Sequence, residues 1–351
     1  MGLTQAQQSL VERARAVGAG GQGVALSDDA CAFVVATIAR DLGVAAKIPG
    51  LPDVLPEFFS SQHSASLIVR NANFLAWLER LLALAPDADT YFACLAKLHR
   101  TRVKYQKILE TQPIPTLEQV GPRGLLQYGH LSPAGLTALL FWRKWMFDID
   151  NRAGQETGYL FEPIIASAIG GVSASSQRSP VRRKGAKSKG RQVDCIKDKR
   201  AYEFKIRVTI AASGQGRWRE ELEFPQDCRS SGFVPVLVVL DSTSNPKLDE
   251  LRAAFVKAKG EVFVGDAAWE HLEGVAGATM SVFLEKYVRA PLRDLLETAP
   301  TRLPDLLMRD GGDVLSIGVG TETLTISRSP SSDFDMEEPL PDDVDEEAGG
   351  P

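Results

Sequence analysis

Two carboxylates and a lysine lie close together in a predicted β-hairpin in the second half of the chain. Residues 192–196 and 201–209 each alternate apolar and polar side chains, and the polar residues 197–200 separate them. This pattern is typical of two antiparallel strands joined by a tight turn. A turn centred in the middle of the polar segment would place Asp194 directly opposite Glu203.

Such a pair needs a reason, because like charges directly opposite each other destabilise a sheet. A divalent cation supplies one, since Mg²⁺ takes hard oxygen ligands and commonly binds one or two carboxylates together with water and substrate phosphate. Lys205 follows Glu203 by two residues and shares its face of the strand. Its ammonium could orient a water or balance the charge that develops on phosphorus, so the residues indicate phosphodiester hydrolysis.

The reverse face of the hairpin is expected to be apolar and to belong to the core. Strand alternation assigns it Val193, Cys195, Tyr202, Phe204, Ile206 and Val208. Paired strands with one apolar face favour the catalytic interpretation of the polar face. The alternative is an ordinary solvated face on which Glu, Lys and Arg neutralise one another.

The segment before the hairpin is strongly basic. Residues 178–207 hold twelve Lys or Arg and only three acidic residues. Basic side chains in a Gly- and Ser-rich loop are typical of contacts to DNA phosphates, although a solvated loop would look similar. Together with a later Arg-Trp-Arg segment, which could equally be a surface strand, the candidate DNA-binding residues are Arg182, Arg183, Lys184, Lys187, Lys189, Arg191, Arg217 and Arg219.

The hairpin resembles the active site of the PD-(D/E)XK nuclease superfamily. Gln-Val-Asp194-Cys-Ile, a short turn and Tyr-Glu203-Phe-Lys205 carry the likeness, with Val193 where the superfamily usually has Pro. The segments Phe-Trp-Arg-Lys-Trp-Met-Phe-Asp-Ile-Asp-Asn-Arg (141–152) and Glu-Thr-Gly-Tyr-Leu-Phe-Glu (156–162) most resemble the ApaLI-type family of type II restriction endonucleases. This likeness spans most of residues 70–300.

The resemblance implies a role for each residue of the hairpin. Asp194, Glu203 and the Phe204 carbonyl would be ligands of Mg²⁺, and Lys205 would be the water-orienting base or electrostatic partner. These enzymes also place a glutamate on a helix just upstream. Glu162 is the first choice for this acid and Glu156 the second. Pro163 would kink or begin a helix there, and Glu162 could instead be a helix-N-terminal acid favoured by the dipole.

The elements that position these residues divide near residue 150. The first part has apolar residues at helical spacing, with prolines between the segments, and predicts helices over 29–41, 65–84, 90–109 and 136–147. The second part predicts a buried strand at 233–240, a helix at 247–259, a strand at 261–264, helices at 266–273 and 280–297, and a hairpin at 314–327. Strand, helix and strand in this order imply a parallel crossover. We therefore expect an α/β fold, with a mixed, restriction-endonuclease-like sheet flanked by helices and an all-helical N-terminal domain.

Composition supports this division and limits the class of protein. Residues 331–351 hold nine acidic residues and no Lys or Arg, which predicts a disordered acidic tail. Without them, 40 basic residues face 36 acidic ones, so the remaining chain is mildly basic. Scattered cysteines, no secretory signal and no long apolar run indicate a cytoplasmic protein without a membrane span. The expected domains are 1–150 as a DNA clasp or recognition domain, 151–330 as the nuclease domain, and 331–351 as the tail.

The leading hypothesis is a Mg²⁺-dependent type II restriction endonuclease that cuts double-stranded DNA at a short palindrome. A twofold site favours a homodimer. The resemblance implies a target like GTGCAC and no organic cofactor. Two alternatives stay open: a structure-specific repair or recombination nuclease, and a DNA-binding regulator without catalysis.

Overall fold

A computed structural model gives the fold of the chain. It describes residues 2–17, 23–59, 63–116, 131–184, 186–206, 215–298, 301–302 and 304–329. The predicted acidic tail at 331–351 lies outside these residues, as does the end of the second strand of the predicted hairpin.

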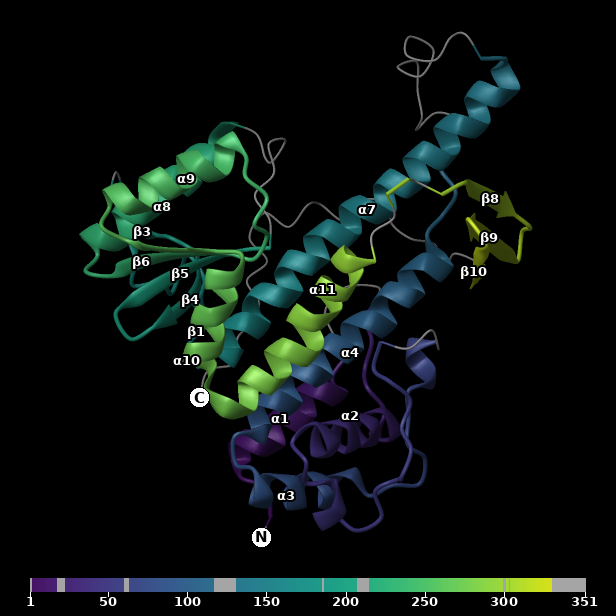
Figure 1. Ribbon diagram of the computed structural model, residues 1–351, viewed down its shortest axis with the longest axis horizontal. Coiled ribbons are helices and arrows are strands. Elements are labelled where there is room, and N and C mark those ends of the chain that lie inside the picture. The colour runs from purple at the N-terminus through teal and green to yellow at the C-terminus, as the bar shows by residue number, and fades with distance from the viewer. Residues whose placement is uncertain are drawn as a thin grey trace.

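The N-terminal part of the chain is helical, as the sequence predicts (Figure 1). Its elements are α1 (Gln5–Arg15), α2 (Asp28–Asp41), η1 (Ala45–Lys47), η2 (Ser64–Ser66), α3 (Phe74–Leu84) and α4 (Ala88–Thr111). Side chains cap several of these helices: the Ser27 hydroxyl accepts the Ala30 N–H, and the Asn73 carbonyl oxygen accepts the Ala76 N–H. The helix expected from residue 65 therefore begins only after the Asn73 cap.

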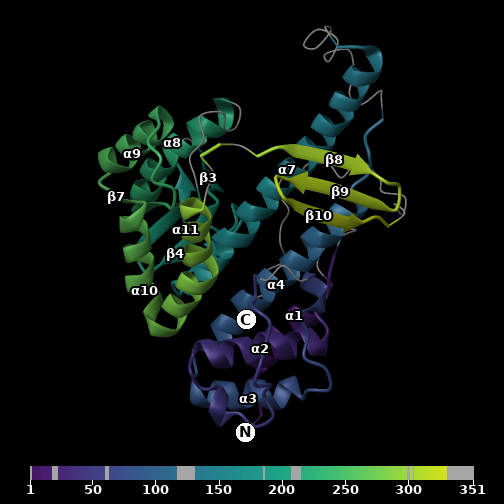
Figure 2. The same ribbon diagram turned by 45° about the vertical axis from the view of Figure 1, so that its right-hand side comes forward.

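A single long helix, α7 (Pro133–Ala168), links the N-terminal part to the sheet (Figures 1 and 2). The Ser132 hydroxyl caps it by accepting the Gly135 N–H. The sequence predicted only 136–147, but the helix crosses residue 150 and continues through Pro163. Proline removes one backbone donor. The turns on both sides are nevertheless held by burial, since Leu160 and Ile164 are almost fully buried.

Five strands of the described chain form a mixed sheet in the order β1-β4-β5-β6-β7. They are β1 (Val172–Ala174), β4 (Val193–Lys197), β5 (Arg200–Lys205), β6 (Val234–Val239) and β7 (Glu261–Val264). β1, β4 and β5 pair antiparallel, whereas β5, β6 and β7 pair parallel. The helix between β6 and β7 makes the expected crossover, so the predicted α/β fold with a mixed sheet is confirmed.

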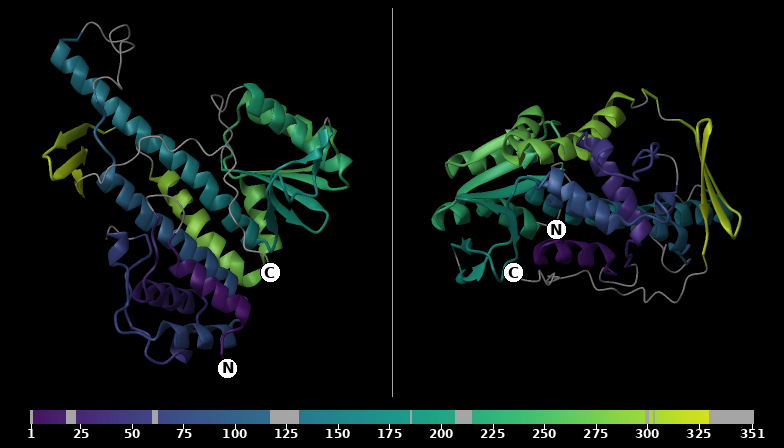
Figure 3. Two further views of the ribbon diagram at one scale, coloured as in Figure 1. Left: turned by 180° about the vertical axis from the view of Figure 1, so that it is seen from behind. Right: turned by 90° about the horizontal axis from the view of Figure 1, so that it is seen from below.

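Helices cover both faces of this sheet (Figure 3). On one face, α8 (Gln215–Ser230) and α9 (Pro246–Lys257) bury Phe224 and Phe255 against Ala201 and Leu237. On the other face, α7 and α10 (Asp266–Leu284) pack against the sheet residues Cys195, Tyr202, Phe204, Val236 and Val238. The catalytic candidates of the hairpin therefore lie between two helical layers.

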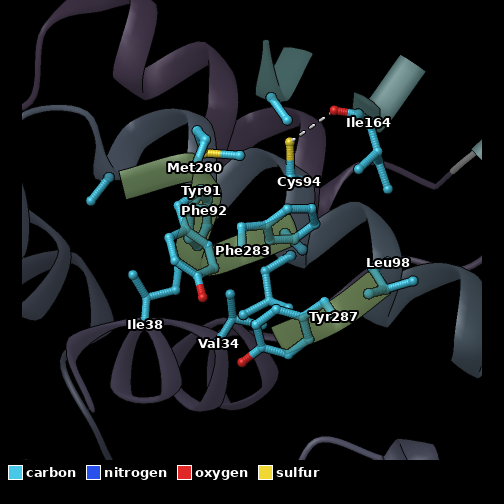
Figure 4. Packing of buried hydrophobic residues seen from close by; sticks show 14 of the residues in the cluster. Val34, Ile38, Tyr91, Phe92, Cys94, Leu98, Ile164, Met280, Phe283 and Tyr287 are labelled. Atoms are coloured by element: carbon cyan, nitrogen blue, oxygen red, sulfur yellow. Dashed lines mark hydrogen bonds between the residues drawn. The ribbon is translucent and has the colours of Figure 1, made fainter. Parts of the chain in front are cut away.

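One hydrophobic cluster extends from the N-terminal helices to the sheet (Figure 4). Phe92 and Cys94 of α4 pack in it with Ile164 of α7 and Phe283 of α10, and the Cys94 thiol lies 3.9 Å from the Ile164 carbonyl oxygen. α10 breaks at Gly277, whose φ of 76° suits glycine, so the expected helices 266–273 and 280–297 form one kinked unit that continues into η3 (Glu285–Arg289) and α11 (Ala290–Glu297).

The C-terminal described residues form a small antiparallel sheet of β8 (Leu306–Asp310), β9 (Val314–Val319) and β10 (Glu322–Ser327). Its inner residues Leu315 and Ile326 pack on Trp145 of α7 and Leu109 of α4, away from the main sheet (Figure 2). The predicted hairpin at 314–327 is confirmed as β9 and β10. Within the described residues, no helix is both long and apolar enough to cross a membrane.

Candidate active site

The hairpin β4–β5 has the predicted turn and the predicted register near it. Asp198 adopts a left-handed conformation with φ 54° at the turn, which a short polar side chain tolerates. The recorded pairs are Lys197 with Arg200, Ile196 with Ala201, and Cys195 with Tyr202. The sequence predicted the same pairs, and it also predicted that the ladder would continue to Asp194 and Glu203. The recorded pairing ends before that pair.

A β-bulge in β4 accounts for this difference. β1 advances two residues from Val172 to Ala174, while the paired stretch of β4 covers three, from Ile196 back to Val193. The extra residue reverses the alternation, so Val193 packs with the α8–α9 layer and Cys195 with the α7–α10 layer. The prediction that Val193 and Cys195 share one face was therefore wrong, because strict alternation does not survive a bulge.

The bulge directs the Asp194 side chain toward the backbone of β5. Its Oδ2 accepts the Phe204 N–H at 2.8 Å, in the place where a backbone ladder bond would lie. In an antiparallel ladder the N–H and C=O of one residue leave the strand at the same edge. The Phe204 carbonyl therefore faces the same edge as the Asp194 carboxylate.

Lys205 lies between two carboxylates. Its Nζ is 2.9 Å from Glu203 Oε1 on the same strand and 3.6 Å from Glu221 Oε1 on α8. All three side chains are partly buried, with 15–24% of their surface exposed. Burial by itself would lower the pKa of Lys205, but the charges of Glu203, Glu221 and Asp194 outweigh it and raise that pKa, so the amine is a protonated ammonium.

Glu162 reaches this group from α7. Burial raises the pKa of Glu162 to about 7, and the charge of Glu203 adds to the rise while Lys205 opposes it. Burial also raises the pKa of Asp194 well above the usual range, with further contributions from Glu203 and Glu162. The charge of Glu203 thus contributes to the raised pKa values of both Glu162 and Asp194. We call Glu162, Asp194 and Glu203 the carboxylate cluster.

The carboxylate cluster suits a hard divalent cation in its donor chemistry. Its donors are all oxygens, which hard cations prefer, and burial, with the charge of Glu203, raises the pKa values of Glu162 and Asp194. In the described part of the chain, however, no three Asp, Glu, His or Cys side chains already surround a possible metal position. A cation there would have to draw the carboxylates together.

Glu221 is a residue of this site that the sequence analysis missed. The segment around Arg217 was interpreted as a possible DNA contact or a surface strand, whereas it is the beginning of α8. A helical interpretation would have put an acidic residue on the helix that follows the lysine strand. Glu156 lies in α7 as expected, but its side chain is outside the described set.

The basic segment forms the two-stranded sheet β2 (Arg182–Arg183) and β3 (Ala186–Gly190), and it is attached to α8. Arg191 is 5% exposed, and its Nε donates to Asp227 Oδ2 at 3.0 Å. Arg183 lies 2.6 Å from Glu220. The Asp227 carboxylate also accepts the Lys184 N–H at 2.8 Å. Arg191 and Arg183 therefore use their charge to hold this basic hairpin on α8.

The remaining candidate DNA contacts differ in exposure. Arg182 and Lys184 project from the basic hairpin with exposed side chains. Arg219 is 82% exposed and pairs with Glu223 at 2.8 Å. The side chains of Lys187, Lys189 and Arg217 lie outside the described set, although their backbones belong to β3 and α8.

Comparison with known proteins gives the class of protein to which the chain belongs. A family model described as ApaLI-like restriction endonuclease matches residues 61–289, which include the whole carboxylate cluster and Lys205. The protein is thus a nuclease of a restriction–modification system. The chain is also 44% identical over 324 residues to the type II restriction enzyme ApaLI of Acetobacter pasteurianus, covering 85% of this chain and 86% of that relative.

The chain belongs to the ApaLI-like restriction endonuclease family. This confirms the family that segments 141–152 and 156–162 indicated. No solved structure matches the chain.

Proposed function

We propose that the protein is a Mg²⁺-dependent type II restriction endonuclease that hydrolyses one phosphodiester in each strand of a short palindromic site. The observation that carries the proposal is that Glu162 and Asp194, whose pKa values are raised by burial and by the charge of Glu203, lie near Glu203 and its Lys205 partner. Buried acids that disfavour each other's ionisation are costly without a cation, and perturbed groups of this kind gather at functional sites.

In this proposal Asp194, Glu203 and the Phe204 carbonyl hold the metal. When bound, Mg²⁺ supplies positive charge that polarises the scissile phosphate and lowers the pKa of the attacking water. The Lys205 ammonium donates a hydrogen bond to that water or to a phosphate oxygen. Glu162 is poised to accept a proton near neutral pH because burial raises its pKa to about 7. Glu156 remains the second choice for that role.

The DNA would lie along the basic hairpin. Arg182 and Lys184 are the described exposed cations there, and we include Lys187, Lys189, Arg217 and Arg219 as further phosphate contacts. Arg183 and Arg191 contribute by holding the hairpin in place. The N-terminal helices would clasp or read the duplex, and two copies of the chain would face the two halves of the palindrome, since a twofold site suits a twofold protein.

The similarity to the relative named ApaLI is the basis of the target that we propose. We propose a site resembling GTGCAC, cut in the cytoplasm where unmodified foreign DNA arrives. The test is digestion of unmethylated plasmids, with and without one GTGCAC sequence, in Mg²⁺. Discrete products from the first plasmid alone, with ends that map to the site by sequencing, are expected. Discrete cutting of both plasmids at another sequence would overturn the target.

The same digestion separates the two alternatives. A structure-specific repair nuclease would leave both plasmids uncut or smeared, and would cut branched or flapped DNA instead. A DNA-binding regulator would cut nothing and would bind duplex equally well with and without Mg²⁺.

A further inference from the structure

The Lys205 ammonium, near the carboxylate cluster, has two anionic partners on different elements. Lys205 Nζ lies 2.9 Å from Glu203 of its own strand and 3.6 Å from Glu221 of α8. If Glu203 is a metal ligand, as proposed above, this arrangement creates a competition. The ammonium and the metal would then both need the same carboxylate.

We infer that Glu221 is a positioning residue, which holds the Lys205 ammonium in place when Glu203 turns to the metal. An ammonium left without a counter-ion beside a divalent cation would be repelled from it, because like charges at short range in a partly buried site interact strongly. A second carboxylate offsets this repulsion and keeps the ammonium near the reacting phosphate. The inference rests on the proposed function, since it assumes that Glu203 binds metal.

The surroundings of Glu221 favour this role, because α8 packs on the sheet just after Glu221 and is joined to the basic hairpin just before it. Phe224 is 3% exposed and packs in the core with Ala201 of β5. Glu220 lies 2.6 Å from Arg183 of the basic hairpin. A carboxylate on so firmly held a helix can define a position for Lys205, whereas Glu203 would have to adjust to the metal.

The same helix offers a matched control. Glu223 lies two residues further along α8, pairs with Arg219 at 2.8 Å and is 51% exposed. Glu221→Gln and Glu223→Gln remove one charge each from α8 with little change of shape. Only the first removes a partner of Lys205.

The experiment measures the melting temperature of the full chain against Mg²⁺ concentration, without DNA and at constant ionic strength. In Glu221→Gln we expect the midpoint Mg²⁺ concentration to rise about tenfold, within the range of coupling between contacting charged groups. Glu223→Gln should match wild type. With plasmid DNA, Glu221→Gln should lower kcat and leave KM unchanged, and Glu221→Asp should recover part of the loss.

A double-mutant cycle separates positioning from the general negative field of Glu221. In a Lys205→Met background, Glu221→Gln should cause no further change in the Mg²⁺ midpoint. An equal shift in both backgrounds would overturn the inference, and so would an unchanged midpoint in the single variant. Wild type that gains no stability with Mg²⁺ would refute the metal site itself, and the Asp194→Asn comparison below identifies that outcome separately.

Discussion

At the scale of single residues, Glu162 links the protonation of the site to the stability of the fold. Its pKa is about 7 in the folded chain, compared with an ordinary value of 4.5. Between these values the folded state binds the proton more tightly than the unfolded state. The resulting stabilisation is therefore complete below pH 4.5 and is lost as the pH rises through about 7.

The prediction concerns the metal-free protein. Its free energy of unfolding, measured by urea titration from pH 5 to pH 8, should fall with pH more steeply in wild type than in Glu162→Gln, which cannot ionise. Glu223→Gln, which removes an exposed carboxylate, should keep the wild-type slope. Parallel curves for wild type and Glu162→Gln would show that Glu162 titrates normally.

Metal binding should have the opposite dependence on pH. A bound cation favours the ionised form of a neighbouring carboxyl group, so the Mg²⁺ affinity should increase as the pH rises through about 7, the pKa of Glu162. Isothermal titration calorimetry at pH 6 and pH 8 measures this. Equal affinity at both pH values would mean that the raised pKa values do not belong to the metal site.

At the scale of elements, the ion pair between Arg191 and Asp227 attaches the basic hairpin to α8. Both residues are nearly buried, with exposures of 5% and 4%. Removing Asp227 leaves the Arg191 charge buried with Glu220, at 3.7 Å, as a more distant and more exposed partner, and breaking a buried pair typically costs about 3–5 kcal/mol. Asp227→Ala should lower the free energy of unfolding by roughly that amount, as measured by urea denaturation. Asp249→Ala, which removes an exposed carboxylate of α9, should change it by less than about 0.5 kcal/mol.

The double variant Arg191→Leu with Asp227→Leu tests the reason for this loss. It should be more stable than Asp227→Ala, since no buried charge is left alone. A double variant as unstable as the single one would indicate that the hairpin depends on these residues for something other than charge pairing.

The exposed cations of the basic hairpin should contribute to DNA affinity but not to sequence specificity. Neutralising Arg182 and Lys184 as glutamines should weaken binding to all duplexes similarly and should flatten the dependence of log Kd on log salt by about 0.9 per lost phosphate contact. Arg252 and Lys257 on α9 make a matched control pair. Fluorescence anisotropy over a salt series measures both, and a loss confined to one sequence would instead make these residues readers of bases.

The hairpin also shows what a sequence can and cannot predict at this scale. Its polar turn and alternating strands determined three residue pairs correctly, because turn chemistry and strand periodicity are local. The bulge at Asp194 was not predictable from alternation, since it arises where β4 must also match β1. The bulge is nevertheless what directs the Asp194 carboxylate toward Phe204.

At the scale of the whole molecule, α7 and the shared core join the two halves that the sequence seemed to separate. The long helix carries Glu162 to the sheet, while its other end packs on the small β8–β10 sheet (Figures 1 and 2). The change in sequence texture near residue 150 lies ahead of the mixed sheet, whose first strand begins at Val172. It gave no sign that one helix crosses that point, because helix length is decided by packing rather than by local pattern.

The position of Glu221 has the same explanation. Nothing near it in the sequence connects it with Lys205, and only the packing of α8 on the sheet brings the two together. The family and the residues of the hairpin could be inferred from sequence because the motifs that indicate them are short and local. Glu162 and Glu221, which interact electrostatically with the hairpin residues, come from other segments of the chain.

The central claim is that the carboxylate cluster is a metal-binding nuclease site, and Asp194→Asn tests it most directly. Without metal, the variant loses one of several mutually repelling carboxylates, so it should melt at or slightly above the wild-type temperature. Wild type should gain stability with Mg²⁺ and DNA, because a ligand that binds only the folded state stabilises it by mass action. The variant should lose most of that gain and all detectable plasmid cleavage. If Asp194→Asn cuts the plasmid at a rate near that of wild type, the active site lies elsewhere and the account is wrong.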